Sequence, residues 1–201
     1  MVGTTKMKMS RSLSMFSLGL MVLGLISAGQ AEPFVTEGRG GKLLSFPHGV
    51  ASFADRLVRF IPGSPPAEPD FCDGESAVGP RNYTYQKDGK KFTSFGKGGI
   101  IVLEFTDNRL VDIEGDDLYV FEIGPTVEAM YVAISEDGQN WISVGRVAGN
   151  KASLDIAPYV KPGQKFRYIG LTDDPEDGRH SGRTGGADLD AVGAFGSVPF
   201  P

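Results

Sequence analysis

The sequence contains few of the residues that most often carry enzymatic chemistry. Its 201 residues include one cysteine, Cys72, and two histidines, His48 and His180. A single cysteine excludes an intrachain disulfide. So few cysteines and histidines argue against a zinc centre, which draws most of its ligands from these two residue types. The Gly-x-Ser-x-Gly motif of many serine hydrolases is also missing from the sequence. Together these absences favour a non-catalytic protein.

Basic charge and long apolar runs are scarce beyond the first 31 residues. Three basic residues precede the apolar run Leu13–Ile26, and small residues lead up to Ala31, which is the order of an export signal. We expect cleavage after residue 31, with an N-terminal membrane anchor as the alternative. No later run is long enough to span a bilayer. The expected location is the periplasm, the outer cell surface or the space beyond the cell.

The charge balance excludes one class of partner. Residues 1–31 carry three basic and no acidic side chains, so their removal takes the formal net charge from −5 to −8. Nucleic-acid binding needs a basic patch that neutralises phosphates, and an acidic domain lacks it. An acidic surface is compatible with divalent cations instead.

Turn-forming residues divide the rest of the chain into short apolar segments. Glycine occurs 28 times and proline 13 times, a pattern typical of an antiparallel, jelly-roll-like β-sandwich. We predict this all-β domain at residues 51–201, preceded by an irregular segment at 32–50. The stretch Phe53–Gly63 fits either a short helix or an edge strand. For the rest of the domain we predict strands only, at 98–105, 117–123, 131–135, 141–147, 151–156, 166–173 and 187–195.

Several sequence phrases carry a resemblance. The stretch SEDGQNWISVG (135–145), followed by FRYIGLTD (166–173), resembles the hairpin and strand of discoidin-like, galactose-binding-like jelly rolls. Adding FADRLVRFIPGS (53–64), GKGGIIVLEFTDNRLVDIEGDDLYVFEIG (96–124) and GADLDAVGAF (186–195), the set is similar to a domain of bacterial exported cell-surface proteins, including some OmpA-family and sorting-signal proteins. The resemblance covers about residues 51–195. It implies a β-sandwich whose loops bind glycans or calcium.

Acidic residues gather at the ends of the predicted strands. Calcium takes six to eight oxygen ligands, and glycine-rich turns beside carboxylates can supply them. We therefore predict a calcium site assembled from distant segments, although solvated turn acids would give the same pattern. The predicted ligands are Asp112, Asp116, Asp117, Glu122, Asp188 and Asp190.

Two of these predictions carry a more specific geometry. In a regular strand, Asp188 and Asp190 point to the same side as Val192, which puts the two acids at the exposed end of the strand. Glu122 shares a face with two apolar residues. It is therefore an edge acid, a ligand, or a partner of Arg167, because buried carboxylates are rare without partners.

Aromatic and polar residues in two loops form a second candidate site. Aromatic rings can stack on the apolar faces of sugars while polar neighbours fix their orientation. The predicted ligand-binding residues are Tyr83, Tyr85, Asp173, Asp174, Arg179 and His180. For Trp141 we expect burial in the core, where large aromatic side chains usually lie.

The sequence thus predicts an exported, non-catalytic binding module, stabilised by calcium, that recognises carbohydrate or another surface component. A structural or adhesive surface protein with a protein partner is the first alternative. The second is a calcium-dependent glycan hydrolase, which would use a pair of carboxylates.

Overall fold

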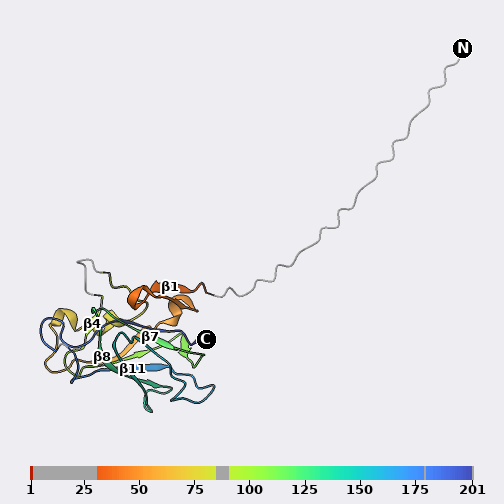
Figure 1. Ribbon diagram of the computed structural model, residues 1–201. Helices are drawn as coiled ribbons and strands as arrows, with labels where there is room; N and C mark the ends of the chain where they lie inside the picture. Colours follow the sequence, from red (N-terminus) through yellow and green to blue (C-terminus); the bar gives the residue numbers. More distant parts are fainter. Residues whose placement is uncertain (2–30, 85–90, 179, 201) are drawn as a thin grey trace.

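Two antiparallel sheets form the body of the molecule (Figure 1). The computed structural model describes Met1 and residues 31–84, 91–178 and 180–200. The five-stranded sheet has the order β3-β5-β11-β8-β9, and the four-stranded sheet has the order β10-β7-β12-β4. The chain is an all-β sandwich, as the spacing of its turn residues predicts.

The bounds of the strands locate the sheets in the sequence. The five-stranded sheet contains β3 (Arg56–Ile61), β5 (Ile100–Glu104), β11 (Tyr168–Asp173), β8 (Val127–Ser135) and β9 (Ile142–Gly149). The four-stranded sheet contains β10 (Ser153–Leu154), β7 (Leu118–Glu122), β12 (Asp188–Ala194) and β4 (Thr93–Ser94). Two smaller pairs are β1 (Phe34–Glu37) with β2 (Leu43–Phe46), and β6 (Asn108–Leu110) with β13 (Ser197–Pro199). Short 3-10 helices lie at Arg39–Gly41, Gly49–Ser52, Pro69–Phe71 and Gly74–Ala77.

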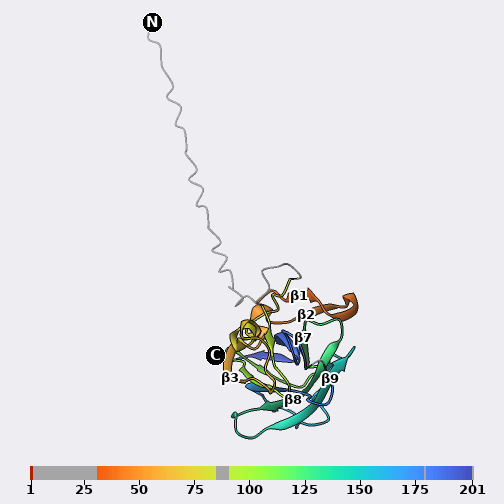
Figure 2. The same ribbon diagram turned by 90° about the vertical axis from the view of Figure 1, so that its left-hand side faces the viewer.

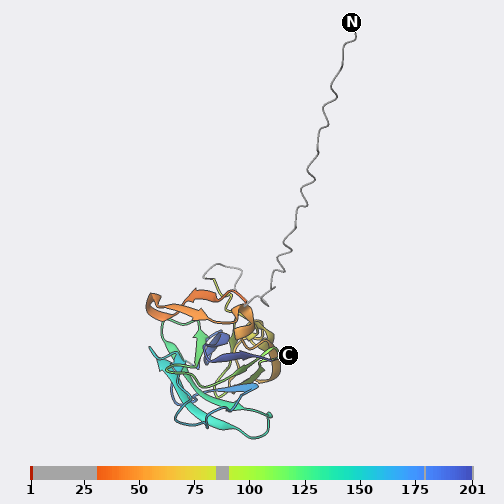
Figure 3. The ribbon, with the colours of Figure 1, turned by 90° about the vertical axis from the view of Figure 1, so that its right-hand side faces the viewer.

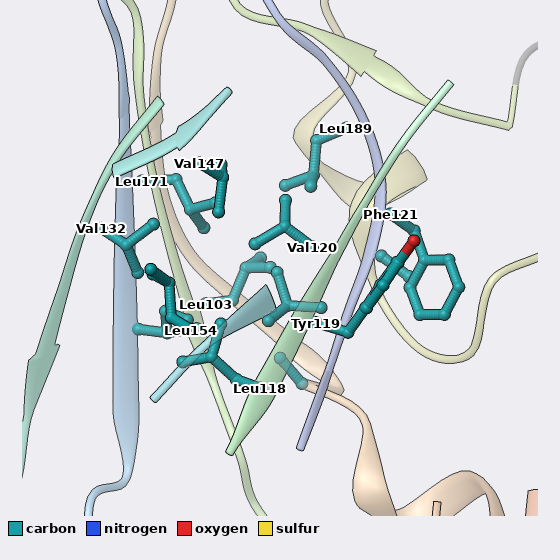
Figure 4. Close-up of a cluster of buried hydrophobic side chains, with 14 of the residues drawn as sticks. Leu103, Leu118, Tyr119, Val120, Phe121, Val132, Val147, Leu154, Leu171 and Leu189 are labelled. Atoms are coloured by element: carbon teal, nitrogen blue, oxygen red, sulfur yellow. The ribbon is translucent and has the colours of Figure 1, made fainter. Parts of the chain in front are cut away.

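The core lies between the two sheets and follows from strand alternation. In β5, Ile101 and Leu103 are fully buried, whereas Ile100 and Val102 are half-buried and face outward. Figure 4 shows the inward side chains of both sheets meeting: Leu103 and Leu171 come from the five-stranded sheet, and Val120 and Leu189 come from the four-stranded sheet. The five-stranded sheet therefore has one buried face and one accessible face.

The four-stranded sheet is buried on both faces, because the β1–β2 hairpin forms a third layer. Every residue of β7 and β12 is buried. Tyr119 and Phe121 project from the opposite side of β7 to Val120 (Figure 4). Phe46 from β2 packs over Gly193, and its ring stacks on Phe195 with centroids 4.8 Å apart. The hairpin lies over β7 in both side views (Figures 2 and 3).

The prediction of an irregular segment at 32–50 was wrong. β1 and β2 pair in register from Phe34–Phe46 to Glu37–Leu43. The glycines that suggested irregularity form the turn instead, since Gly40 and Gly41 take positive φ angles of 66° and 74°. Within Phe53–Gly63 the edge-strand alternative is confirmed, because β3 pairs with β5 alone.

All seven strands predicted between residues 98 and 195 are present. Strand β8 begins earlier than expected, at Val127. The hairpin turn at 136–140 joins β8 to β9 as predicted. Within the described ranges, no helix has the length and apolar character to cross a membrane.

Phe46→Ala tests whether the hairpin is an integral layer. Phe46 is fully buried against rings of the four-stranded sheet, so its loss should lower the free energy of unfolding by about 3–5 kcal/mol. The control is Leu43→Ala in the same strand. Leu43 is 70% exposed, so this change should stay within about 0.5 kcal/mol. Chemical denaturation measures both, and a cost below about 1 kcal/mol for Phe46→Ala would show that the hairpin adds little to the fold.

Candidate functional site

A groove of about 610 Å³ lies on the accessible face of the five-stranded sheet. Outward side chains from all five strands line it, together with the turn between β8 and β9. Its floor is apolar and its sides carry aromatic rings and a few polar groups. The lining residues include Val58, Ile100, Val102, Tyr131, Trp141, Ser143, Tyr168, Gly170 and Thr172.

Trp141 lies in this groove, so the expectation of a core tryptophan was wrong. Its side chain is 38% exposed. A Cβ on Gly170 would lie 3.2 Å from Cζ3 of the indole, so the ring occupies the space that a side chain at position 170 would fill. Glycine in β11 thus creates a seat for the ring on the outside of the sheet.

Strand alternation carries a signal that could have located this surface. In β11, Ile169 and Leu171 are fully buried, while Tyr168, Gly170 and Thr172 point outward. A strand that sends two large aliphatic residues inward must present its tyrosine, glycine and threonine on the other face. Seating Trp141 on that face requires pairing between strands, which the local sequence does not show.

The turn at one end of the groove is held by a dense set of hydrogen bonds. Asp137 Oδ1 accepts from the backbone N–H groups of Gln139 and Asn140, each at 2.8 Å. Ser135 Oγ accepts from Gly138 N at 2.9 Å and donates to Asn140 O at 2.6 Å. The hydrogen bonds from Asn140 and Gln139 hold the pKa of Asp137 well below its usual range. The turn is therefore rigid and negatively charged.

Tyr131 forms another side of the groove and is 48% exposed. The guanidinium of Arg146 lies 5.9 Å from the centroid of the Tyr131 ring. Arg146 also pairs with Asp174 at 2.9 Å and with Asp177. Asp174, a predicted ligand-binding residue, is thus engaged in an ion pair beside the groove.

The structure separates the six predicted calcium ligands. β7 and β12 run antiparallel, with Leu118 opposite Ala194 and Glu122 opposite Leu189. Asp117, just before β7, therefore lies at the other end of the strand pair from Glu122 and Asp188. The six residues do not form one site.

Asp117 is buried and holds two segments of the chain. Its Oδ1 accepts from Ile113 N and its Oδ2 from Ile156 N, both at 2.7 Å. Burial raises the pKa of this carboxyl. Asp112 and Asp155 bring carboxylate oxygens within 4.8 Å of it, but both are exposed. Asp116 accepts a hydrogen bond from Ser153 Oγ.

Asp188 and Asp190 are buried, so their expected place at an exposed strand end was wrong. A β-bulge between Leu189 and Ala191 interrupts the alternation at Asp190. Asp190 accepts hydrogen bonds from Asn82 N at 3.1 Å and Tyr83 N at 3.2 Å. Asp188 accepts from Ser94 Oγ. Burial raises the pKa of Asp188 to about 7 and also raises that of Asp190.

Glu122 has a partner that the sequence did not suggest. Arg39, from the turn of the β1–β2 hairpin, places Nη2 2.6 Å from Glu122 Oε2. Arg167, the partner expected from the sequence, pairs with buried Glu104 together with Arg56. Burial raises the pKa of Glu122 to about 8 despite the nearby guanidinium.

The predicted ligand-binding residues fall at different places. His180 Nε2 lies 3.0 Å from Asp173 Oδ2, and fully buried Asp173 also accepts from Gly98 N and Ala187 N. Tyr83 lines a separate pocket with Asp190. Tyr85 and Arg179 lie outside the described residues. None of the predicted ligand-binding residues that the structure describes lines the groove.

No family model and no curated protein sequence matches the chain. Among solved structures, the C-terminal domain of a chitobiase from Bacteroides fragilis is similar, with a TM-score of 0.44 and 18% sequence identity. The match covers 76% of this chain and 99% of that chain.

Asp117→Ala tests whether this acid is a structural anchor. The change leaves the buried N–H of Ile156 and the partly buried N–H of Ile113 without their acceptor, so we expect a loss of about 2 kcal/mol or more in the free energy of unfolding. Asp116→Ala, at the exposed neighbouring position, should cost less than about 0.5 kcal/mol. Urea unfolding with and without added calcium checks both variants. If the Asp117→Ala deficit appeared only in the presence of calcium, Asp117 would be a ligand instead of an anchor.

Proposed function

We propose that the protein is an exported, non-catalytic binding module that holds a carbohydrate in the groove on the five-stranded sheet. The observation that supports this most directly is the position of Trp141, whose exposed indole lies over Gly170 on the accessible face of the five-stranded sheet. Tryptophan is enriched at binding interfaces, where its large apolar ring makes contact and its N–H donates a hydrogen bond.

The composition of the groove suits a sugar. Carbohydrates present apolar C–H faces and polar hydroxyl edges, and the groove offers both complements. Trp141, Tyr131 and Tyr168 supply aromatic surface, while Asp137 and Thr172 supply polar groups beside it. Its volume of about 610 Å³ falls in the range of about 300–1,000 Å³ that is common for small-ligand pockets.

The groove is also preorganised. The central strand β11 is held in place because its backbone is hydrogen-bonded to β5 on one side and to β8 on the other. The turn carrying Asp137 is held by its own hydrogen bonds. Binding would therefore order few additional groups, which favours affinity for a weakly interacting ligand such as a sugar.

The carboxylates of the groove support binding over hydrolysis. Glycoside hydrolysis generally requires two carboxyl groups on either side of the scissile bond. Among the described residues that line the groove, Asp137 is the sole acid, and its oxygens accept hydrogen bonds within the turn. This arrangement favours a binding module over the glycan-hydrolase alternative.

Trp141→Ala should weaken retention on a bound polysaccharide at least about tenfold, because loss of a central aromatic contact costs about 2 kcal/mol or more. Depletion from solution by cellulose, chitin and peptidoglycan identifies the ligand and gives the affinities. Tyr159→Ala is the matched control. Tyr159 is 48% exposed and does not line the groove, so this variant should bind like the wild type.

The same experiment has an internal optical readout. Trp141 is the only tryptophan of the chain, so a ligand in the groove should change its fluorescence directly. Equal binding by Trp141→Ala and the wild type would refute the groove as the site. Failure of the wild type to bind any of the three polysaccharides would favour the alternative of a surface protein with a protein partner.

A further inference from the structure

A second pocket, of about 330 Å³, lies at the far end of β7 from Asp117. Three acidic residues from three strands line it: Glu122 at the end of β7, Asp188 at the start of β12 and Glu128 in β8. The loop segments 124–126 and 181–184 complete its walls. It is separate from the groove, with which it shares no lining residue.

One carboxylate oxygen in this pocket is buried and lacks a hydrogen-bond partner. The side chain of Glu122 has 0% relative exposure. Its Oε2 receives Arg39 Nη2 at 2.6 Å and Gly124 N at 3.1 Å. Its Oε1 has no partner among the described residues. A buried polar atom without a partner costs free energy, so such atoms are rare unless something else satisfies them.

Glu122 lines both this pocket and a neighbouring pocket, and its unpartnered oxygen lies on the Gly124 side of the carboxylate. A Cβ on Gly124 would lie 2.9 Å from Glu122 Oε1, closer than to Oε2 at 3.4 Å. Gly124 lines the pocket with Asp188 but not the neighbouring pocket that contains Arg39 and Arg81. The lack of a side chain at position 124 therefore lets Glu122 Oε1 and Thr126 O approach each other on this side of the pocket.

The acidic side chains around the pocket repel one another. Asp188 and Glu128 both repel a charge on Glu122, and Glu128 repels a charge on Asp188. Arg39 compensates one charge through Oε2. Arg183 also lines the pocket, but its Nε lies 2.8 Å from Glu68. Because burial and like-charge repulsion both raise the pKa of Glu122 and Asp188, a bound cation would favour the ionised forms of these two carboxyls.

We propose that this pocket binds a divalent cation, calcium in preference to magnesium or zinc, with Glu122 Oε1 and the Asp188 carboxylate as ligands. The available donors are all oxygens: the carboxylates, the hydroxyls of Ser181 and Thr184, and loop carbonyls. Hard oxygen donors select calcium or magnesium over zinc. Donors from three strands and two irregular loops suit the variable coordination of calcium better than the strict octahedron of magnesium.

Calcium titration of the purified protein tests the proposal. Isothermal titration calorimetry with calcium chloride should detect one site, and millimolar calcium should raise the melting temperature by about 3 °C or more relative to EDTA. Magnesium should bind at least about tenfold more weakly. A flat titration together with an unchanged melting temperature would overturn the proposal.

Variants assign the binding to the pocket. Glu122→Gln and Asp188→Asn each remove a charged ligand with little change of shape, so each should weaken calcium binding at least about tenfold. The matched control is Asp112→Asn with Asp155→Asn, which removes the two exposed acids near Asp117 and should leave the titration unchanged. The assignment fails if the control loses calcium binding, or if both pocket variants keep it.

Two ligand variants are needed because Glu122→Gln also removes the charge that Arg39 faces. If this variant does not fold, Asp188→Asn decides. The result is independent of the groove, because retention on a polysaccharide should be the same for Asp188→Asn and the wild type. Loss of calcium binding with retained polysaccharide binding would show that the two sites act separately.

Discussion

Buried carboxylates that accept backbone N–H groups hold this sandwich together at its strand ends. Asp117, Asp173 and Asp190 each accept from two backbone N–H groups outside their own strand. Hydrogen bonds to an ionised acceptor are stronger than neutral ones, and their loss leaves buried donors unsatisfied. The chain has a single cysteine, so these contacts restrain the loops without an intrachain disulfide. Glu122 differs from them because one of its buried oxygens has no hydrogen-bond partner among the described residues.

The strands were predictable because a short apolar run bounded by turn residues is a local signal, whereas the roles of the acids were not. The apolar runs of β5 and β7 are visible in the sequence, and both strands lie inside their sheets. The partner of Glu122 is 83 residues away in a segment expected to be irregular, so no local pattern indicates it. Trp141 is similar: its exposure depends on a glycine in β11, and propensity alone favours burial.

The two sheets differ in how many of their faces are covered. The four-stranded sheet is covered on both faces and stabilises the fold through its packing and its strand-end acids. The five-stranded sheet is covered on one face, which leaves the other open for the aromatic groove. A change of an exposed side chain in the groove should therefore affect the proposed binding with little effect on stability, while a change around β7 and β12 acts on the core.

The layer formed by β1 and β2 also makes the two outer faces of the molecule different. This hairpin covers the outer face of the four-stranded sheet (Figures 2 and 3), and the residues that line the groove lie on the outer face of the five-stranded sheet, on the opposite side of the sandwich. The chain enters the fold through β1. The described chain therefore enters the fold on the face of the sandwich opposite the groove.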